Sequence, residues 1–388
     1  MTLSIDLGFV ALTDAAPLIV AKERGLFAKE GLEVLLHREV SWATVRDKVS
    51  AGVFQGAHML APLAIAARLG LGAERADVMA PMSLNAHGAT IGVSAQLASE
   101  MSELGAAGLA QAIARRLGRA DPQVLFATVF PYSMHNYMLR YWAASAGIDP
   151  DRDMRIVTAP PTSIVDRLKT EAIDGFSVGA PWGAVCEAQC RAKIVLEAGE
   201  FWPGGPDKVL GMSETWAHRE PEAMQALLRA LLQAMSWADA PENLGELAGM
   251  LAAPQYLAAP MDLIGKRLGK EEKSIRFSRA AASFPWQSHA AWIFSQMLRW
   301  GQADHRVDQG RALECYRPDL YRKAAAELGI SAPLADSKME GAHAEPWALP
   351  GSRGPIPMPR DTLPDGAAFD PDSLREYAAS FAISRVNA

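Results

Sequence analysis

Polar and aromatic side chains stand at several places where a predicted strand gives way to a predicted helix, and their types suit an anion. They occur in four segments: "SW" at Ser41 and Trp42, "NAHG" at Asn85 to Gly88, "PYSMH" at Pro131 to His135, and "GAPW" at Gly179 to Trp182. In open α/β sheets, ligands bind beyond the carboxyl ends of the strands. Free backbone N–H groups and the helix dipole favour negative charge there. The sequence therefore predicts a site for a small anion.

Two of these segments offer candidate donors in the first quarter of the chain. Ser41 is expected to cap a helix that begins near Ala43. Trp42 either packs beneath that helix or presents its indole N–H to a ligand. His87 precedes Gly88, and this pair permits close backbone approach while supplying a titratable donor.

A histidine and a lysine supply further candidate contacts. His135 follows Ser133 in the turn before a predicted helix, where its ring can donate to an anion or cap the helix. Lys208, in "PGGPDKVLG", adds a full positive charge, unless it is an ordinary solvated lysine. The sequence leaves both interpretations open for each of these residues.

Patterns for catalysis, cofactors and metals are missing from the sequence. It contains no GxSxG, GxxxxGK[ST] or HExxH motif, and no GxGxxG follows the first predicted strand. Cys186 and Cys190 lie four apart, but no nearby His or Cys completes a tetrahedral metal site, so we expect two buried or half-buried thiols. The sequence favours binding over bond-making, with no catalytic residue, metal site or cofactor.

Composition excludes two further classes of protein. The formal charge is −6 and the pI is near 5.8, so no overall basic field attracts a polyanion, and nucleic acid is not expected as a direct ligand. No apolar run reaches the roughly 18 to 20 residues that cross a bilayer. An odd count of three cysteines indicates a reducing compartment rather than a disulfide framework.

Alternating strands and helices should position these residues. We expect a strand over residues 3–10, a helix over 14–31 with Asp14 as N-cap, and a strand over 32–40, which is a βαβ unit with a parallel sheet. Residues 77–94 read as strand material around an exposed turn. A second α/β unit follows, and from about Met212 the chain turns helical and wraps the first lobe, with an extended surface segment at 335–366.

Long segments of the chain make the expectation more specific. They include "GFVALTDAAPLIVAKERGLFAKEGLEV", "FPYSMHNYMLRYWAASAGIDP", "VTAPPTSIVDRLKTEAIDGFSVGAPW" and "SHAAWIFSQMLRWG". In this order, these segments resemble the nitrate- and bicarbonate-binding proteins of ABC importers, which are type II periplasmic binding proteins. The resemblance implies an α/β fold of two lobes with a ligand cleft between them: residues 1–90 and 210–388 in lobe 1, and 91–209 in lobe 2.

The resemblance also implies which residues surround an oxyanion. Nitrate binders use a tryptophan after the second strand, polar and histidine residues in the cleft, and a lysine from later in the chain. Ala180 stands where related proteins often carry a carboxylate, and this favours nitrate over bicarbonate. The residues carried over as ligand contacts are Trp42, His87, Gly88, His135 and Lys208, with Ser41, Ser133, Trp182 and Arg219 as further cleft residues, Arg219 being the alternative cation to Lys208.

The first residues bear on where the protein works. No Lys or Arg precedes the first apolar residues, and Asp6 and Asp14 interrupt them, so we expect no secretory signal and a cytoplasmic protein. The members of the resembled family that lack a signal are the cytoplasmic nitrate sensors called NasS. The resemblance therefore implies a sensor that controls an RNA-binding antiterminator, NasT, in response to nitrate or nitrite. The alternative is the solute-binding protein of an importer for nitrate, bicarbonate or a sulfonate. A thiamine-pyrimidine- or menaquinone-pathway enzyme on the same fold is a third possibility.

Overall fold

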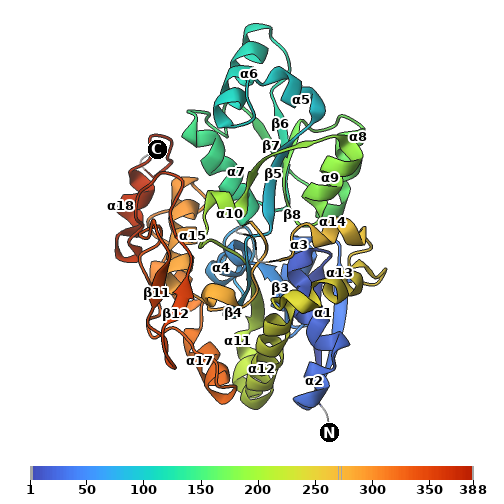
Figure 1. Ribbon diagram of the computed structural model, residues 1–388. Helices are drawn as coiled ribbons and strands as arrows, with labels where there is room; N and C mark the ends of the chain where they lie inside the picture. Colours follow the sequence, from blue (N-terminus) through green and yellow to red (C-terminus); the bar gives the residue numbers. More distant parts are fainter. Residues whose placement is uncertain (1–2, 270, 272, 387–388) are drawn as a thin grey trace.

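Two five-stranded sheets form the centres of two lobes in the computed structural model, which describes residues 3–269, 271 and 273–386 (Figure 1). The first sheet has the order β2-β1-β3-β10-β4 and the second has the order β7-β6-β8-β5-β9. The strands of the first sheet are β1 Leu3–Val10, β2 Leu32–Glu39, β3 Gly56–Leu60, β4 Val78–Ala86 and β10 Pro206–Ser213. Those of the second are β5 Ala89–Val93, β6 Leu125–Thr128, β7 Arg155–Thr158, β8 Gly175–Gly179 and β9 Lys193–Glu197.

The chain passes twice between the sheets, and the level of these two passages is called the waist of the molecule below. The first runs from β4 to β5 and the second leads into β10, so each sheet receives one strand after a crossover. The divisions expected after residues 90 and 209 fall inside β5 and β10. β1 runs parallel to β2 and β3, as the βαβ pattern predicts, but β10 is antiparallel to β3 and β4, so the sheet is mixed. This is the two-lobed α/β fold of periplasmic binding proteins.

Helices cover both sheets. In the first half of the chain they are α1 Ala16–Glu23, α2 Leu26–Lys29, α3 Trp42–Ser50, α4 Ala61–Leu69, α5 Ala95–Glu100, α6 Ala106–Gly118, α7 Met134–Ser145, α8 Ile164–Lys169, α9 Trp182–Cys190 and α10 Ala198–Phe201. In the second half they are α11 Glu214–Arg219, α12 Pro221–Ala238, α13 Leu244–Ala252, α14 Met261–Gly265, α15 Gln287–Arg299, α16 Gln309–Glu314, α17 Pro318–Glu327 and α18 Leu374–Ala379. None of the helices described is both long and apolar enough to cross a bilayer.

The first helix differs from its prediction in a way that matters for the site. Asp14 does not cap it: the residue lies in a single 3-10 turn, Thr13–Ala15, and its side chain is fully buried. The predicted helix over 14–31 is also divided, because Gly25 takes a left-handed conformation at φ 64° and separates α1 from α2. The aspartate is thus held inside the molecule, directly after β1.

Residues 77–94 also differ from their prediction. Both strands expected there are present, as β4 and β5, but their connection is buried rather than exposed, and His87 has 1% of its surface accessible. The connection is buried because it is the crossover between lobes and has protein on every side. Cys186 is buried and Cys190 is half-buried, as the sequence predicts, and burial raises the pKa of both thiols.

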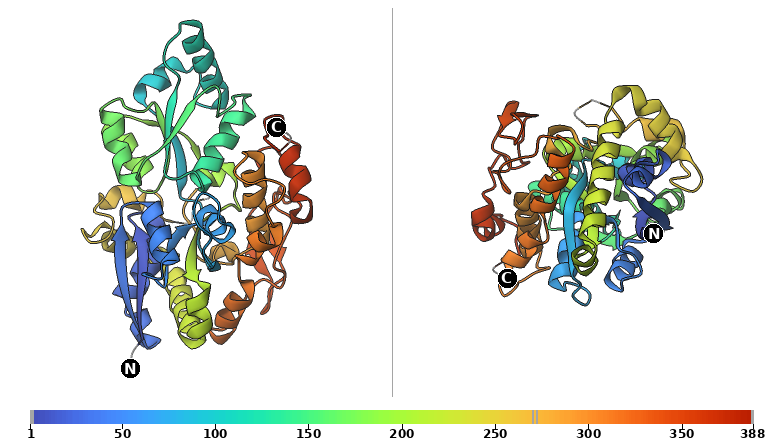
Figure 2. Two further views of the ribbon diagram at one scale, coloured as in Figure 1. Left: turned by 180° about the vertical axis from the view of Figure 1, so that it is seen from behind. Right: turned by 90° about the horizontal axis from the view of Figure 1, so that it is seen from below.

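The C-terminal region wraps the first lobe, as expected, and also reaches the second. In both views of Figure 2 it runs along one flank of the molecule, and a short hairpin, β11 Trp347–Leu349 and β12 Ile356–Met358, lies within it. Beyond α18, Phe381 packs on Tyr141 of α7 with ring centroids 5.3 Å apart. Arg385 pairs with Asp149 at 2.5 Å. The tail therefore supports α7, whose first turn carries His135.

Candidate anion site between the lobes

A buried ion cluster lies in the first lobe at the waist. The Lys208 Nζ is 2.9 Å from Oδ2 of Asp14 and 2.7 Å from Oδ1 of Asp207. His58 Nε2 lies 2.7 Å from the other oxygen of Asp14. Lys208 and Asp207 belong to β10 and His58 belongs to the neighbouring β3, while Asp14 follows β1, so three adjacent strands bring the four groups together. All four side chains are at most 2% exposed.

Burial and mutual charge set the protonation of this cluster. Burial alone would raise the pKa of Asp14, but Lys208 and His58 outweigh it and hold that pKa well below the ordinary range. Burial opposes the charge on Lys208, but the two carboxylates raise its pKa. Burial raises the pKa of Asp207 to about 6, against the pull of Lys208. One ammonium is thus shared by two carboxylates of different proton affinity.

His58 completes the cluster as a neutral ring. Burial lowers its pKa despite the adjacent Asp14 carboxylate. The Val10 N–H donates to its Nδ1 over 3.4 Å, which leaves the proton on Nε2, the atom that faces Asp14. His58 therefore fixes Asp14 by a hydrogen bond from a neutral imidazole and adds no charge.

Several buried polar atoms around the cluster have no hydrogen-bond partner among the described residues. Leaving such groups unsatisfied costs about 1–3 kcal/mol each, so native proteins normally pair them with protein, water or a ligand. The indole of Trp42 stands near the cluster, with its ring centroid 5.3 Å from that of His58 and 5.9 Å from the Lys208 Nζ. The unpaired atoms at this level of the molecule are Nε1 of Trp42, both ring nitrogens of His135, Oγ1 of Thr13 and Oγ of Ser177.

His135 approaches from the second lobe. It lies in the first turn of α7, whose N-cap is Ser133, and it is fully buried. A Cβ placed on Gly179 would lie 3.3 Å from its Nε2 and 3.2 Å from Leu12 of the first lobe, so the missing side chain lets the lobes meet at the histidine. Burial, with Lys208 adding to it, holds the pKa of His135 well below its ordinary value, so the ring is neutral and keeps one N–H donor.

Hydrogen bonds across the waist hold the two lobes together. The Thr13 N–H donates to the Ala180 carbonyl over 2.8 Å, and the Trp182 indole N–H donates to the Ala11 carbonyl over 2.9 Å. Both bonds join the turn after β1 to the segment after β8 and lie beside the ion cluster. The indole N–H of Trp182 therefore already donates to the protein rather than to a ligand.

The predicted pair His87 and Gly88 lies at the crossover rather than beside the Lys208 ammonium. Burial lowers the pKa of His87 to about 3, so its ring is neutral. Its Nδ1 lies 3.1 Å from the Ser274 carbonyl, and its Nε2 lies 2.9 Å from the Pro203 carbonyl and 3.1 Å from an Arg276 guanidinium nitrogen, so protein groups already contact both ring nitrogens. Gly88 has φ 105°, and a Cβ there would lie 3.3 Å from the Asp207 carboxylate, so the glycine makes room for the cluster.

The remaining predicted residues divide by location. Ser41 and Ser133 accept hydrogen bonds from the Thr44 and Asn136 N–H groups and cap α3 and α7, so their hydroxyls serve the helices. Arg219 is exposed in the last turn of α11, outside the buried cluster. Of the two candidate cations, the structure brings only Lys208 to the waist within the part of the chain that it describes.

Sequence reasoning missed three members of the cluster. Asp14 resembled an ordinary N-cap, His58 lies in an apolar strand, and Asp207 adjoins the lysine that was selected. The sequence does carry a signal for such groups, namely a charged or titratable residue inside a run of apolar residues. Such residues are rarely buried unless they are paired. His58 in "GAHML" and "DK" in "PDKVLG" both fit that description.

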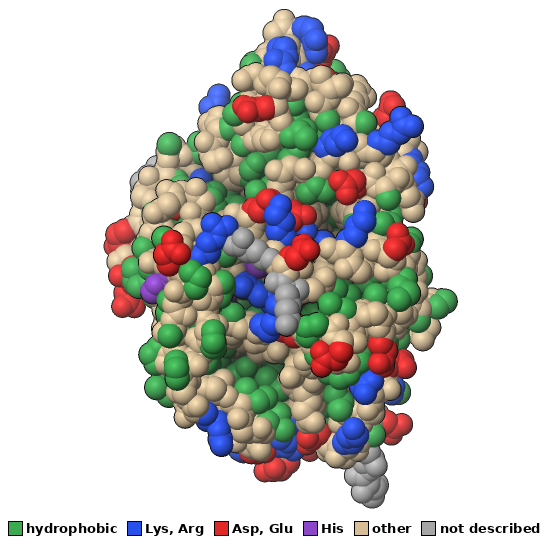
Figure 3. All heavy atoms as spheres, viewed as in Figure 1, with side chains coloured by type: hydrophobic (Ala, Val, Ile, Leu, Met, Phe, Trp, Pro, Cys, Tyr) green, Lys and Arg blue, Asp and Glu red, His purple; other side chains and the backbone are tan. Residues whose placement is uncertain are grey.

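A surface groove in the first lobe is charged but not uniformly basic. Figure 3 shows Lys, Arg, Asp and Glu side chains mixed at the level where the lobes meet. The lining of the groove includes Arg276, Arg279 and Arg360 together with Glu271 and Glu345. The groove lining therefore carries a small excess of positive charge, which favours the approach of an anion to this face.

Comparison with known proteins identifies the family. Residues 2–252 match the model of the NMT1-like family. The chain is 32% identical to the nitrate/nitrite binding protein NrtA of Nostoc sp., over 99% of this chain and 87% of that protein. The chain therefore belongs to the NMT1-like family. The NMT1-like chain is also 28% identical to the bicarbonate-binding protein CmpA of Synechococcus elongatus, over 98% of this chain and 87% of that one.

A solved structure supports the same assignment. The crystal structure of the periplasmic nitrate-binding protein NrtA from Synechocystis has a TM-score of 0.86 to this NMT1-like chain at 29% identity, and 98% of each chain is covered. The desulfurization enzyme DSZB shares the fold at 12% identity with a TM-score of 0.55, so the fold by itself does not distinguish binding proteins from enzymes. The full-length relatives NrtA and CmpA are binding proteins by name.

Proposed function

We propose that the protein binds a small monovalent oxyanion, nitrate or nitrite, between its lobes. The observation that carries this proposal is the set of unpaired buried donors from both lobes, Trp42 and His135 above all, gathered around the buried Lys208 ammonium. A ligand that accepts from these groups would satisfy atoms that the protein leaves without partners. Nitrate is planar and weakly hydrated, so neutral N–H donors with one cation suit its three oxygens.

The relatives support the choice of ligand class. NrtA is named for nitrate and nitrite, and CmpA is named for bicarbonate. We rank nitrate and nitrite ahead of bicarbonate because NrtA has the higher identity and because Ala180 brings no carboxylate to the cleft.

A ligand screen tests this proposal directly. Purified protein is melted in the presence of nitrate, nitrite, bicarbonate, sulfate or taurine, and calorimetry then gives the dissociation constants. A ligand that binds only the folded protein at 100 times its Kd stabilises it by about 2.7 kcal/mol, so nitrate or nitrite should raise the melting temperature. If neither nitrate nor nitrite raises the melting temperature or gives a heat of binding, the proposed function is wrong.

The role that follows binding is the second part of the proposal. The names of two relatives, a periplasmic nitrate-binding protein and a nitrate import ATP-binding protein, support delivery of the anion to a membrane importer. The cytoplasmic sensor that controls a NasT-like antiterminator remains a prediction from the sequence, with its cytoplasmic location. In both roles the anion must bind the closed lobes more tightly than the open ones.

Fractionation and a binding assay separate the two roles. A sensor should be found in the cytoplasm and should form a complex with the antiterminator that nitrate dissolves. An importer's binding protein should be found outside the cytoplasmic membrane and should stimulate ATP hydrolysis by its importer when nitrate is present. An antiterminator complex that is indifferent to both nitrate and nitrite would rule out the sensor role.

A further inference from the structure

The net charge of the buried cluster disfavours the binding of an added anion. With both carboxylates ionised, Asp14 and Asp207 outnumber Lys208, and the cluster carries one net negative charge. The two histidines at the site do not change this sum, because burial lowers the pKa of His58 and of His135. A monovalent anion would bring the total to two negative charges in a region removed from water, which is strongly unfavourable.

Asp207 is the group best placed to remove the excess charge. Asp14 is held by both Lys208 and His58, whereas Asp207 has Lys208 as its only charged partner in the part of the chain described, with the neutral Asn85 amide beside it. Asp207 also lines a small pocket with apolar walls, which include Met134, Met138, Phe201 and Trp202. Apolar walls cannot solvate a carboxylate, so they favour the neutral acid.

We propose that Asp207 is a specificity-determining residue, which takes up one proton from solvent when a monovalent oxyanion binds beside Lys208. The site then admits the anion and a proton together, with no net change of charge. A dianion such as sulfate would need a second proton, for which the cluster has no equally placed acceptor among the described residues. This inference deepens the proposed function and rests on it.

The titration of Asp207 sets the pH range of the effect. Burial places its pKa near 6, so the unliganded protein carries an ionised Asp207 at pH 8 and a largely protonated one at pH 5. Proton uptake on binding should therefore be about one per nitrate at pH 8 and near zero at pH 5. Above pH 6 the Kd for nitrate should rise about tenfold per pH unit, until the pH passes the pKa of Asp207 in the complex.

Calorimetry at pH 8 in Tris, triethanolamine and tricine measures the coupling, because the observed heat varies with the ionisation heat of the buffer in proportion to the protons exchanged. The wild type should take up about one proton per nitrate, and Asp207→Asn, which mimics the neutral acid, should take up none. The matched control is Asp77→Asn, an exposed aspartate paired with Arg75 at 3.5 Å, which should behave like the wild type. Quenching of tryptophan fluorescence between pH 5 and 9 should give a Kd for Asp207→Asn that does not change with pH.

The outcomes separate the coupling from the function. Nitrate binding to the wild type at pH 8 without proton uptake would overturn the coupling and leave the anion site intact. Uptake of one proton by Asp207→Asn would assign the proton to another group, such as His58 or His135, and would overturn the role of Asp207. Sulfate binding as tight as nitrate binding would overturn the claim of specificity. Absence of binding by nitrate and nitrite at every pH would overturn the proposed function itself.

Discussion

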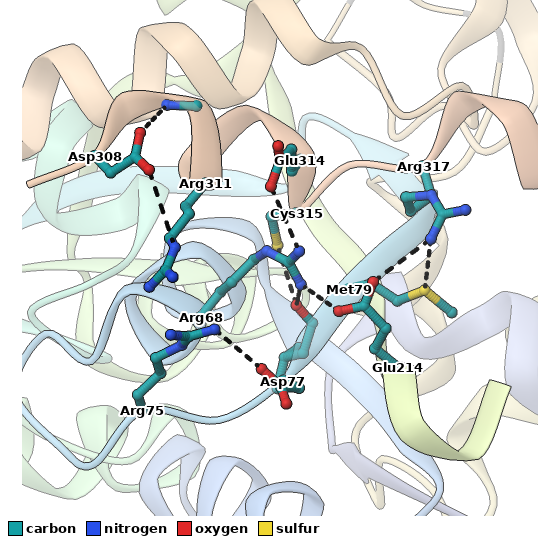
Figure 4. A network of polar contacts seen from close by, with 12 residues as sticks. Arg68, Arg75, Asp77, Met79, Glu214, Asp308, Arg311, Glu314, Cys315 and Arg317 are labelled. Atoms are coloured by element: carbon teal, nitrogen blue, oxygen red, sulfur yellow. Dashed lines mark hydrogen bonds and ion pairs between the residues drawn. The ribbon is translucent and has the colours of Figure 1, made fainter. Parts of the chain in front are cut away.

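Two networks in the first lobe each join a cation to carboxylates, but they differ in burial. At the waist, Lys208 lies between two aspartates at 2.7 and 2.9 Å. Nearer the surface, Arg68 pairs with the half-buried Glu214 at 2.7 Å and lies 3.9 Å from the exposed Glu314, among other ion pairs (Figure 4). The Glu314 side chain is 68% exposed, whereas the cluster at the waist is at most 2% exposed. Water screens the surface network, but the buried one must balance its own charge.

The comparison shows why only one of these networks suits a ligand. In the outer network, water reaches exposed carboxylates such as Glu314 and screens their charge, so this network attracts an incoming anion only weakly. The buried cluster is surrounded by donors that have no partner among the described residues, and its protonation is coupled to burial. Burial, rather than the presence of a cation and two carboxylates, makes this network a site.

The largest effect is expected from removal of the buried cation. Lys208→Met leaves two buried carboxylates without their ammonium, which should lower the free energy of unfolding by about 3–5 kcal/mol and abolish nitrate binding. The control is Arg75→Met, which breaks a surface pair that is half exposed and should cost no more than about 1 kcal/mol, with nitrate binding unchanged. Urea denaturation and calorimetry provide the two measurements. Equal losses of stability in the two variants would remove the distinction between the networks.

A second large effect concerns the two histidines. His135→Phe removes an unpaired buried donor, so nitrate affinity should fall about 10- to 100-fold while the unliganded protein keeps its stability. His87→Phe instead breaks hydrogen bonds to Ser274 and Arg276 and should lower stability by about 1–3 kcal/mol. Melting curves and nitrate titrations of both variants check this. The assignment of His135 to the ligand fails if its substitution leaves nitrate affinity unchanged.

The pH dependence of stability should distinguish the two buried carboxylates by sign. Asp14 has a folded-state pKa below the ordinary aspartate value, so its contribution to stability is present above about pH 4 and is lost as the pH falls further. Asp207 has a raised pKa, so its contribution is present below pH 4 and is lost as the pH rises to about 6. Urea melts of unliganded protein from pH 3 to 8 should show that Asp14→Asn flattens the acid limb and Asp207→Asn the limb between pH 4 and 6. If both variants kept the pH dependence of stability of the wild type over both ranges, these roles would be contradicted.

The smallest effect is expected at a capping residue that the sequence also suggested for the cleft. Ser41→Ala removes the hydroxyl that accepts from the Thr44 N–H, which should lower stability by about 1 kcal/mol. Nitrate affinity should not change, because the hydroxyl already serves the helix. Thermal melts and nitrate titration measure the two quantities, and a marked loss of nitrate affinity would place Ser41 in the site after all.

Much of the fold could be predicted because the local patterns agree with the tertiary structure. The expected strand over residues 3–10 is β1, the expected cap at Ser41 is present, and the helical C-terminal half and the two-lobed α/β fold are confirmed. The errors fall where burial replaced a local rule. Asp14 was expected to cap a helix and instead pairs with Lys208, and the turn at His87 was expected to be exposed and instead crosses between lobes.

The sequence by itself determined the class of protein and most of the residue types at the waist, because hydrophobic periodicity, turn residues and ordered family segments are properties of the chain. It selected Trp42, His135 and Lys208 without placing them together. Only the tertiary structure brought Asp14, His58 and Asp207 to the same lysine, since they come from separate strands that become neighbours in the folded sheet. The charge balance of the site depends on those contacts and on burial, and neither is encoded in any short stretch of sequence.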